Sequence, residues 1–155
     1  MNLIIYFSAE GHTKKAAFKL HELISSEIFE IKTKIPYPDD HKKLLEAAKK
    51  QWENHEDVEL ENDINIDEFD TIYLCYPNWF GTLPLAVAGF LKSHDFTDKQ
   101  IVAICTHGGG GLRNSLKDIK KLAAGVNIKG SLAIYSEDIK YIKNIKNYVV
   151  ICNSL

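Results

Sequence analysis

Six consecutive residues near the start of the chain, Ser8-Ala9-Glu10-Gly11-His12-Thr13, combine two hydroxyl groups with a glycine. They follow an apolar run at 3–7, typical of a buried strand, and precede an amphipathic helical pattern at 14–25. The unpaired N–H groups of a first helical turn attract an anion, and the helix dipole favours negative charge there. The spacing therefore predicts a phosphate site, although a plain turn with a helix capped by Thr13 fits the same residues.

A second candidate loop, Tyr76-Pro77-Asn78-Trp79-Phe80-Gly81-Thr82, places two large aromatic side chains between a proline and a glycine. It directly follows the apolar run at 71–75. Aromatic rings on a surface loop gain from a flat ring system that stacks on them, so Trp79 and Phe80 are candidate stacking residues. The alternative is that both rings pack down on neighbouring helices.

A third loop, Thr106-His107-Gly108-Gly109-Gly110-Gly111, follows the apolar run at 101–105. Four glycines without side chains let the backbone approach a ligand closely. The amides of this loop are then candidates to hydrogen-bond the polar edge of a ring. A flexible loop that binds nothing is the alternative interpretation.

Five apolar runs predict five strands, at 3–7, 28–32, 71–75, 101–105 and 131–135. Helical patterns lie between most of them, at 14–25, at 41–54 with Leu44, Leu45, Ala48 and Trp52 on one face, from Pro84 onward, and at 116–123. Ser136 is expected to cap a fifth helix, whose apolar stripe consists of Ile139, Ile142, Ile145 and Val149. The region 33–69 is longer than a simple connection and is expected to hold a helix plus an excursion.

Alternating strands and helices predict an α/β fold, a three-layer sandwich with a five-stranded parallel sheet in the order 2-1-3-4-5 and helices on both faces. In this order ligands bind beyond the carboxyl ends of strands one, three and four. The three candidate loops, 8–13, 76–82 and 106–112, are therefore expected at one edge of the sheet.

Size and composition are those of one ordinary globular domain spanning residues 1–155. With 45% hydrophobic residues, 26% charged residues and a net charge of −2, the chain lacks the basic footprint of a nucleic-acid-binding protein. No apolar run approaches the ~20 residues that span a membrane. The first strand begins too early to leave room for a signal peptide, so a cytoplasmic protein is expected.

The three cysteines, Cys75, Cys105 and Cys152, show neither metal-site nor CxxC spacing. Those that end apolar runs are expected to pack as small hydrophobic side chains, which fits a reducing compartment. The six histidines lack ligand spacing as well, so no metal site is expected.

Two common phosphate motifs are missing from the sequence. There is no GxxxxGK[ST] pattern, and there is no GxGxxG because Gly108 to Gly111 are followed by Leu112-Arg113-Asn114. This argues against a nucleoside triphosphate or a Rossmann-type dinucleotide site. What remains suits a single phosphate monoester.

Taken together, the three loops resemble those of the flavodoxin family. The strand followed by Ser8–Thr13 is similar to the flavodoxin loop that holds the phosphate of FMN. The segment 76–81 resembles the YPxWWG-type loop of a bacterial flavodoxin-like family, and 106–111 resembles its TSGGSG-type loop. Two further segments, Ile35-Pro36-Tyr37-Pro38 and Phe69-Asp70-Thr71-Ile72, extend the resemblance over nearly the whole chain.

The resemblance implies a flavodoxin-like fold with noncovalently bound FMN. The phosphate would be held by Ser8, Ala9, Glu10, Gly11, His12 and Thr13. The isoalloxazine ring would be lined by Pro77, Asn78, Trp79, Phe80 and Gly81, with Trp79 as the main stacking candidate. The pyrimidine edge would meet Thr106, His107, Gly108 and Gly109. No catalytic acid or base is assigned.

Three positions depart from the family pattern. Glu10 stands where many flavodoxins have threonine, so its carboxylate is expected to turn away from the phosphate while its N–H still serves. His12 replaces the usual asparagine. His107 and the glycines stand where many flavodoxins stack a tyrosine, which would leave one flavin face open to a nicotinamide, a quinone or a partner chain. His107 is a candidate donor to the N1/C2 carbonyl edge, and a solvent-facing histidine is the alternative.

Two functions fit these residues. The first is a redox protein that transfers electrons through FMN between partner proteins. The second is an NAD(P)H-dependent FMN oxidoreductase with a quinone or similar small acceptor. Such carriers usually present a strongly acidic face, so the charge of −2 and the open flavin face favour the second. A phosphorylation receiver is excluded because Phe7-Ser8 supplies no acidic residue after the first strand. A homodimer is compatible with either function.

Overall fold

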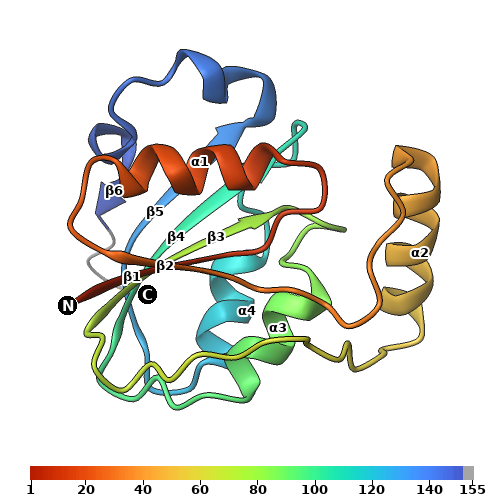
Figure 1. The fold of residues 1–155 in the computed structure, drawn as a ribbon, viewed down its shortest axis with the longest axis horizontal. Helices are drawn as coiled ribbons and strands as arrows, with labels where there is room; N and C mark the ends of the chain where they lie inside the picture. Colours follow the sequence, from red (N-terminus) through yellow and green to blue (C-terminus); the bar gives the residue numbers. More distant parts are fainter. Residues whose placement is uncertain (152–155) are drawn as a thin grey trace.

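The computed structural model describes residues 1–151. The elements follow in the order β1 (Asn2–Tyr6), α1 (His12–His21), β2 (Glu27–Glu30), α2 (His41–Glu53), β3 (Thr71–Pro77), α3 (Leu85–Lys92), β4 (Gln100–His107), α4 (Ser115–Leu122), β5 (Asn127–Tyr135), η1 (Ser136–Tyr141), η2 (Ile145–Tyr148) and β6 (Val150–Ile151). Figure 1 shows one twisted sheet with α1 on one face and α3 and α4 on the other.

The strand order of the sheet is β2-β1-β3-β4-β5-β6. The first five strands pair in parallel in the predicted order 2-1-3-4-5, so the predicted flavodoxin-like α/β sandwich is confirmed. A sixth strand, which the sequence did not predict, runs antiparallel to β5 and pairs Gly130 with Ile151. Gly130 makes room for this return, because a Cβ built on it would lie 2.8 Å from Cγ1 of Val149.

Strand β1 shows how the sequence builds two cores. Leu3 and Ile5 join the core under α3 and α4, whereas Ile4 and Tyr6 join the core under α1. All four side chains are buried, because a parallel sheet is covered on both faces. Because β1, β3 and β4 are neighbours and run parallel, their carboxyl ends lie side by side at one edge of the sheet.

The predicted fifth helix is wrong. Two short 3₁₀ turns, η1 and η2, take its place, and Tyr135 rather than Ser136 occupies the N-cap position. Ile139, Ile142 and Ile145 recur every three residues, which is the 3₁₀ period, and β-branched residues disfavour an α-helix. Ile139 and Ile145 are nevertheless buried in the core under α1.

Helix α2 does not cover a face of the sheet. It lies beyond the carboxyl ends of the strands, to the right in Figure 1. The Asp40 side chain caps it by accepting the N–H of Lys43 at 3.0 Å. Only part of the predicted apolar face is buried: Leu44 and Ala48 are inside, while Leu45 and Trp52 are each 43% exposed.

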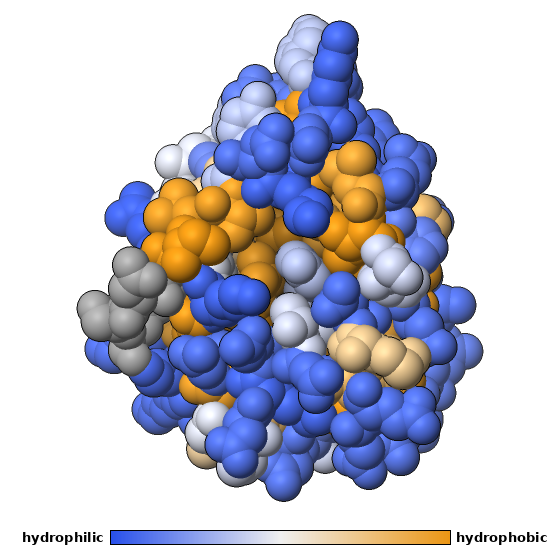
Figure 2. Space-filling model, turned by 90° about the vertical axis from the view of Figure 1, so that its left-hand side faces the viewer, coloured by the Kyte–Doolittle hydropathy of each residue, from blue (hydrophilic) through white to orange (hydrophobic). Residues whose placement is uncertain are grey.

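The short β6 lies at the end of the molecule that Figure 2 turns toward the viewer. Apolar surface gathers there within a largely hydrophilic surround. Val150 and Ile151 are both more than half exposed. Among residues 1–151, no helix has the length and apolar character needed to cross a membrane.

The cysteines at the ends of apolar runs pack as predicted. Cys75 and Cys105 are buried free thiols. Burial raises the pKa of the Cys105 thiol to about 12, so this group stays protonated at neutral pH. Cys152 lies outside the described residues.

We expect the 3₁₀ segment, η1 and η2, to contribute to the stability of the core although it is not an α-helix. Ile139→Ala should lower the free energy of unfolding by about 2–5 kcal/mol, because the side chain is 1% exposed and its removal leaves a cavity. Tyr141→Ala, at a residue 72% exposed, should change it by less than about 0.5 kcal/mol. Urea unfolding followed by circular dichroism measures both. Equal stabilities would contradict the packing described here.

Candidate functional site

The phosphate loop, residues 8–13, joins β1 to α1. Gly11 is the N-cap of α1, with φ 95° in the left-handed region that favours glycine. Oγ of Ser8 accepts the N–H of Gly11 at 3.1 Å, which leaves the Ser8 hydroxyl proton for a further acceptor. No side chain caps α1, and its first turn has no acidic residue. The helix start thus presents N–H groups and a positive dipole end, which suits an anion.

The carboxylate of Glu10 points away from this helix start. Its Oε2 lies 2.9 Å from Nδ1 of His41, the first residue of α2. The side chain therefore turns outward, as the sequence analysis expected. His12 is half-buried where α1 begins.

Two buried threonines connect the phosphate loop to the glycine loop, residues 106–111. The hydroxyl oxygens of Thr13 and Thr106 are 2.8 Å apart, and both residues are about 1% exposed. Thr13 therefore does not cap the helix. One hydroxyl proton serves this buried contact, which ties the start of α1 to the glycine loop.

The aromatic loop, residues 76–82, contains a two-residue turn. The N–H of Trp79 donates to the carbonyl of Thr82 at 2.9 Å, and the reverse bond is 3.1 Å. Phe80 and Gly81 adopt φ values of 56° and 81°, as a type I′ turn requires. A phenylalanine in this conformation costs roughly 1–2 kcal/mol. Its ring lies 5.6 Å from that of Trp52 on α2, so Phe80 follows the alternative of packing on a helix.

The ring of Trp79 is half-buried in an aromatic cluster. It meets Phe7 edge-on at 5.5 Å and Tyr37 at 5.2 Å. Tyr37 donates to Oε1 of Gln51 at 2.6 Å, and burial raises the pKa of Tyr37 to about 12. These contacts pack the Trp79 ring against its neighbours and the main core, and its role as a stacking residue stays a prediction.

Asn78 ties the aromatic loop to the glycine loop. Its Nδ2 donates to the carbonyl of Gly111 at 2.7 Å, and its Oδ1 accepts the N–H of Gly81 at 3.0 Å. Its backbone N–H donates to the carbonyl of Thr106 at 2.8 Å. The predicted site residue Asn78 thus positions the loops, and its amide is already engaged. Pro77 ends β3 beside Thr106.

The glycine loop has open space above most of its backbone. A Cβ built on Gly108, Gly109 or Gly111 would meet no atom within 4 Å. Nδ1 of His107 accepts the N–H of Gly109 at 3.0 Å, so Nε2 carries the proton of the neutral ring. The His107 ring also lies 6.1 Å from that of Tyr135. This leaves Nε2 as the nitrogen of His107 that is able to donate to a ligand.

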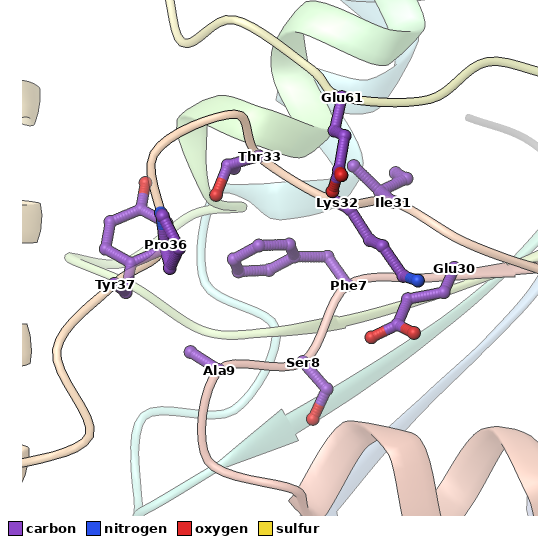
Figure 3. A pocket seen from close by; sticks show the side chains of 10 residues that line it. All are labelled: Phe7, Ser8, Ala9, Glu30, Ile31, Lys32, Thr33, Pro36, Tyr37 and Glu61. Atoms are coloured by element: carbon purple, nitrogen blue, oxygen red, sulfur yellow. The ribbon is translucent and has the colours of Figure 1, made fainter.

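A cavity of about 270 Å³ opens beside the phosphate loop. Figure 3 shows Phe7 at its centre, Pro36 and Tyr37 on one side, and Glu30 and Lys32 on the other. Ser8 and Ala9 of the phosphate loop border it as well. The cavity places apolar and charged groups next to the candidate anion site.

Sequence reasoning missed four residues that support this site: Tyr37, His41, Gln51 and Trp52. All lie in the region 33–69, whose path the strand pattern did not predict. Tyr37 had one signal, since it falls in the Ile35–Pro38 segment that resembles the family.

Comparison with known protein families identifies the family of this chain. A family model described as flavodoxin matches residues 1–149. The chain belongs to the flavodoxin family. None of the curated proteins that were compared matches it.

Solved structures share the flavodoxin fold. A candidate flavoprotein from Bacteroides eggerthii superposes with a TM-score of 0.77 at 24% identity, covering 90% of this chain and 93% of that one. A flavoprotein in complex with FMN from Lactobacillus acidophilus gives 0.68 at 24% identity, covering 90% and 96%. Oxidised flavodoxin 2 from Bacillus cereus gives 0.55 at 14% identity, covering 95% of each chain.

The residues of this flavodoxin fit FMN, the cofactor of its family. The start of α1 has N–H groups for a phosphate, Trp79 offers an aromatic surface, and Gly108 and Gly109 leave room for a ring edge. The one carboxylate in the phosphate loop is paired with His41. Among residues 1–151, no group of three or more metal-ligating side chains is arranged around a metal position.

We expect Gly110 and Gly108 to differ sharply when substituted. A Cβ on Gly110 would lie 2.9 Å from Nδ2 of Asn78, so Gly110→Ala should displace that amide and cost about 1–3 kcal/mol. Gly108→Ala meets open space and should change stability by less than about 0.5 kcal/mol. Thermal unfolding of the cofactor-free proteins tests this. Two variants of equal stability would argue against Asn78 as the link between the loops.

Proposed function

We propose that this chain is an FMN-binding redox protein that transfers electrons through its noncovalently bound cofactor. The observation that supports the proposal most directly is the start of α1. No side chain caps it after Gly11, and it lies at the edge where the aromatic and glycine loops meet. FMN supplies the electron chemistry when bound, and the protein supplies binding and orientation.

The chain's own residues divide this work between them. The N–H groups at the start of α1 and the hydroxyl of Ser8 bind the phosphate. The Thr13–Thr106 pair keeps the phosphate loop beside the glycine loop. Trp79, fixed by Phe7 and Tyr37, shields the ring system from water on one side. Nε2 of His107 holds a proton that it is able to donate to the carbonyl edge.

One observation favours an NAD(P)H-dependent oxidoreductase as a second candidate. The loop 106–111 has His107 as its single ring side chain, and that ring is held by Gly109 and lies toward Tyr135. A nicotinamide or a small acceptor such as a quinone would then have access to the exposed flavin face. We rank this candidate second because the observation concerns access to the flavin face and identifies no residue that would bind the nicotinamide.

We expect purified protein to bind FMN and quench its fluorescence. Gly108→Val should weaken FMN binding at least tenfold, since its side chain would occupy the space we assign to the pyrimidine edge. Its stability without FMN should not change, because the built Cβ meets no neighbour. Gly89→Ala in α3, where a Cβ makes only an ordinary 3.8 Å contact, serves as the control. Calorimetric titration that detects no FMN binding by the wild type would refute the proposal.

The two candidate functions differ in their response to NADPH. We expect anaerobic mixing of the FMN-loaded protein with NADPH to reduce the flavin more slowly than about 1 s⁻¹, the lower end of typical enzyme turnover. Stopped-flow absorbance at the flavin band measures the rate. Fast bleaching by NADPH or NADH would instead establish the oxidoreductase.

A further inference from the structure

Positive charge is concentrated in one part of this chain. Residues 106–135 contain five cationic side chains, Arg113, Lys117, Lys120, Lys121 and Lys129, and one acidic side chain, Asp118. This segment therefore has a net charge of +4 within a chain whose net charge is −2, so the remaining residues carry −6. The chain is electrically polarised although its total charge is small.

Four of these cations form one surface, which we call the basic α4 face: Arg113, Lys117, Lys120 and Lys121. Lys117 is followed at three and four positions by the other two lysines, a spacing that brings side chains together on one side of a helix. All four residues are exposed, and none forms an ion pair with another residue of 1–151. Asp118, the acidic neighbour, instead accepts the hydroxyl of Thr82.

The basic α4 face begins at the loops assigned to the cofactor. A Cβ built on Gly110 would lie 3.9 Å from Nε of Arg113, and one built on Gly81 would lie 3.9 Å from Cβ of Arg113. The N–H of Asn114 donates to the carbonyl of Gly81 at 2.9 Å. From there the face follows α4 for about 12 Å, given the rise of 1.5 Å per residue. A partner seated on it would stand next to the glycine loop.

The shape of this face favours a protein over a small ligand. An open hollow of about 410 Å³ is lined by Leu116, Lys117, Lys120 and Lys121, all from one helix. A small-molecule site buries most of its ligand between converging polar groups, which one exposed helix does not offer. Exposed charges of one sign around a small apolar floor instead suit electrostatic docking of an oppositely charged protein.

We propose that the basic α4 face docks an acidic one-electron carrier protein beside the glycine loop. This proposal rests on the proposed function, because it names the redox partner of the same cofactor site. In each encounter the partner gives up one electron and the cofactor of this chain takes up one, or the reverse. No bond is formed or broken.

Binding is tested separately from redox activity. ¹⁵N-labelled protein is titrated with an acidic plant-type [2Fe–2S] ferredoxin at low salt, first without and then with FMN. We expect amide shifts concentrated in 107–122, fading as the salt concentration rises. Shifts on α2 or on the 3₁₀ segment, with none on α4, would overturn the proposal. Because the first titration needs no cofactor, its outcome is independent of whether FMN binds.

Electron transfer is tested with charge reversals that leave Arg113 and the cofactor loops intact. In K117E/K120E/K121E the second-order rate constant with reduced ferredoxin should fall at least tenfold at low ionic strength. The control K140E/K143E/K146E has the same charge change on the 3₁₀ segment and should stay within about twofold of the wild type. Equal losses in both triple variants would mean that net charge alone causes the effect. They would overturn the assignment of docking to the basic α4 face.

Two competing occupants are distinguished in the same experiments. A short DNA duplex that shifts the same amides at 150 mM salt, where ferredoxin no longer does, would overturn the proposal in favour of nucleic acid. NADPH that shifts them, together with a raised KM for NADPH in K117E/K120E/K121E, would overturn it in favour of a dinucleotide. Failure of FMN uptake with intact ferredoxin binding would refute the proposed function and leave the docking face standing.

Discussion

The amide of Asn78 fixes the spacing of two loops that leave different strands. Its side chain bonds to Gly81 and Gly111, while its backbone N–H bonds to Thr106. One residue thus shapes the aromatic turn and attaches it to the glycine loop. Gly110 lacks a side chain for the same reason, since a Cβ there would meet this amide. Because the loops are ordered against each other in advance, a ligand has less conformational entropy to remove on binding.

Helix α2 depends on these loops more than on the sheet. Its first residue, His41, pairs with Glu10 of the phosphate loop, and near its end Trp52 packs on Phe80 of the aromatic loop. The long excursion 33–69 therefore builds an outer wall of the site. It also explains how the phosphate loop accommodates a carboxylate. The contact with His41 draws Glu10 away from the place where an anion would lie.

The sequence predicted the parallel sheet and the meeting of the three loops because long apolar runs and the glycine, aromatic and hydroxyl clusters after them are strong local signals. It could not predict the 3₁₀ turns at Ile139 and Ile145, since apolar residues every three positions fit an α-helix nearly as well. The outward turn of Glu10 followed from charge repulsion, but its partner His41 depends on the tertiary path of α2. The contact of Phe80 with Trp52 could not be predicted either, because it also depends on the tertiary path of α2.

The two outermost strands of the sheet have a consequence for how copies of this chain behave at high concentration. An unprotected edge strand invites another chain to add to the sheet. Here β2 is four residues long, with glutamates at both ends, and β6 has two residues. The β2 edge is therefore too short and too charged to template a further strand, whereas β6 pairs with β5 at Gly130 and Ser131. The β2 edge should therefore resist strand addition, while Val150 and Ile151 leave exposed apolar side chains at the other edge.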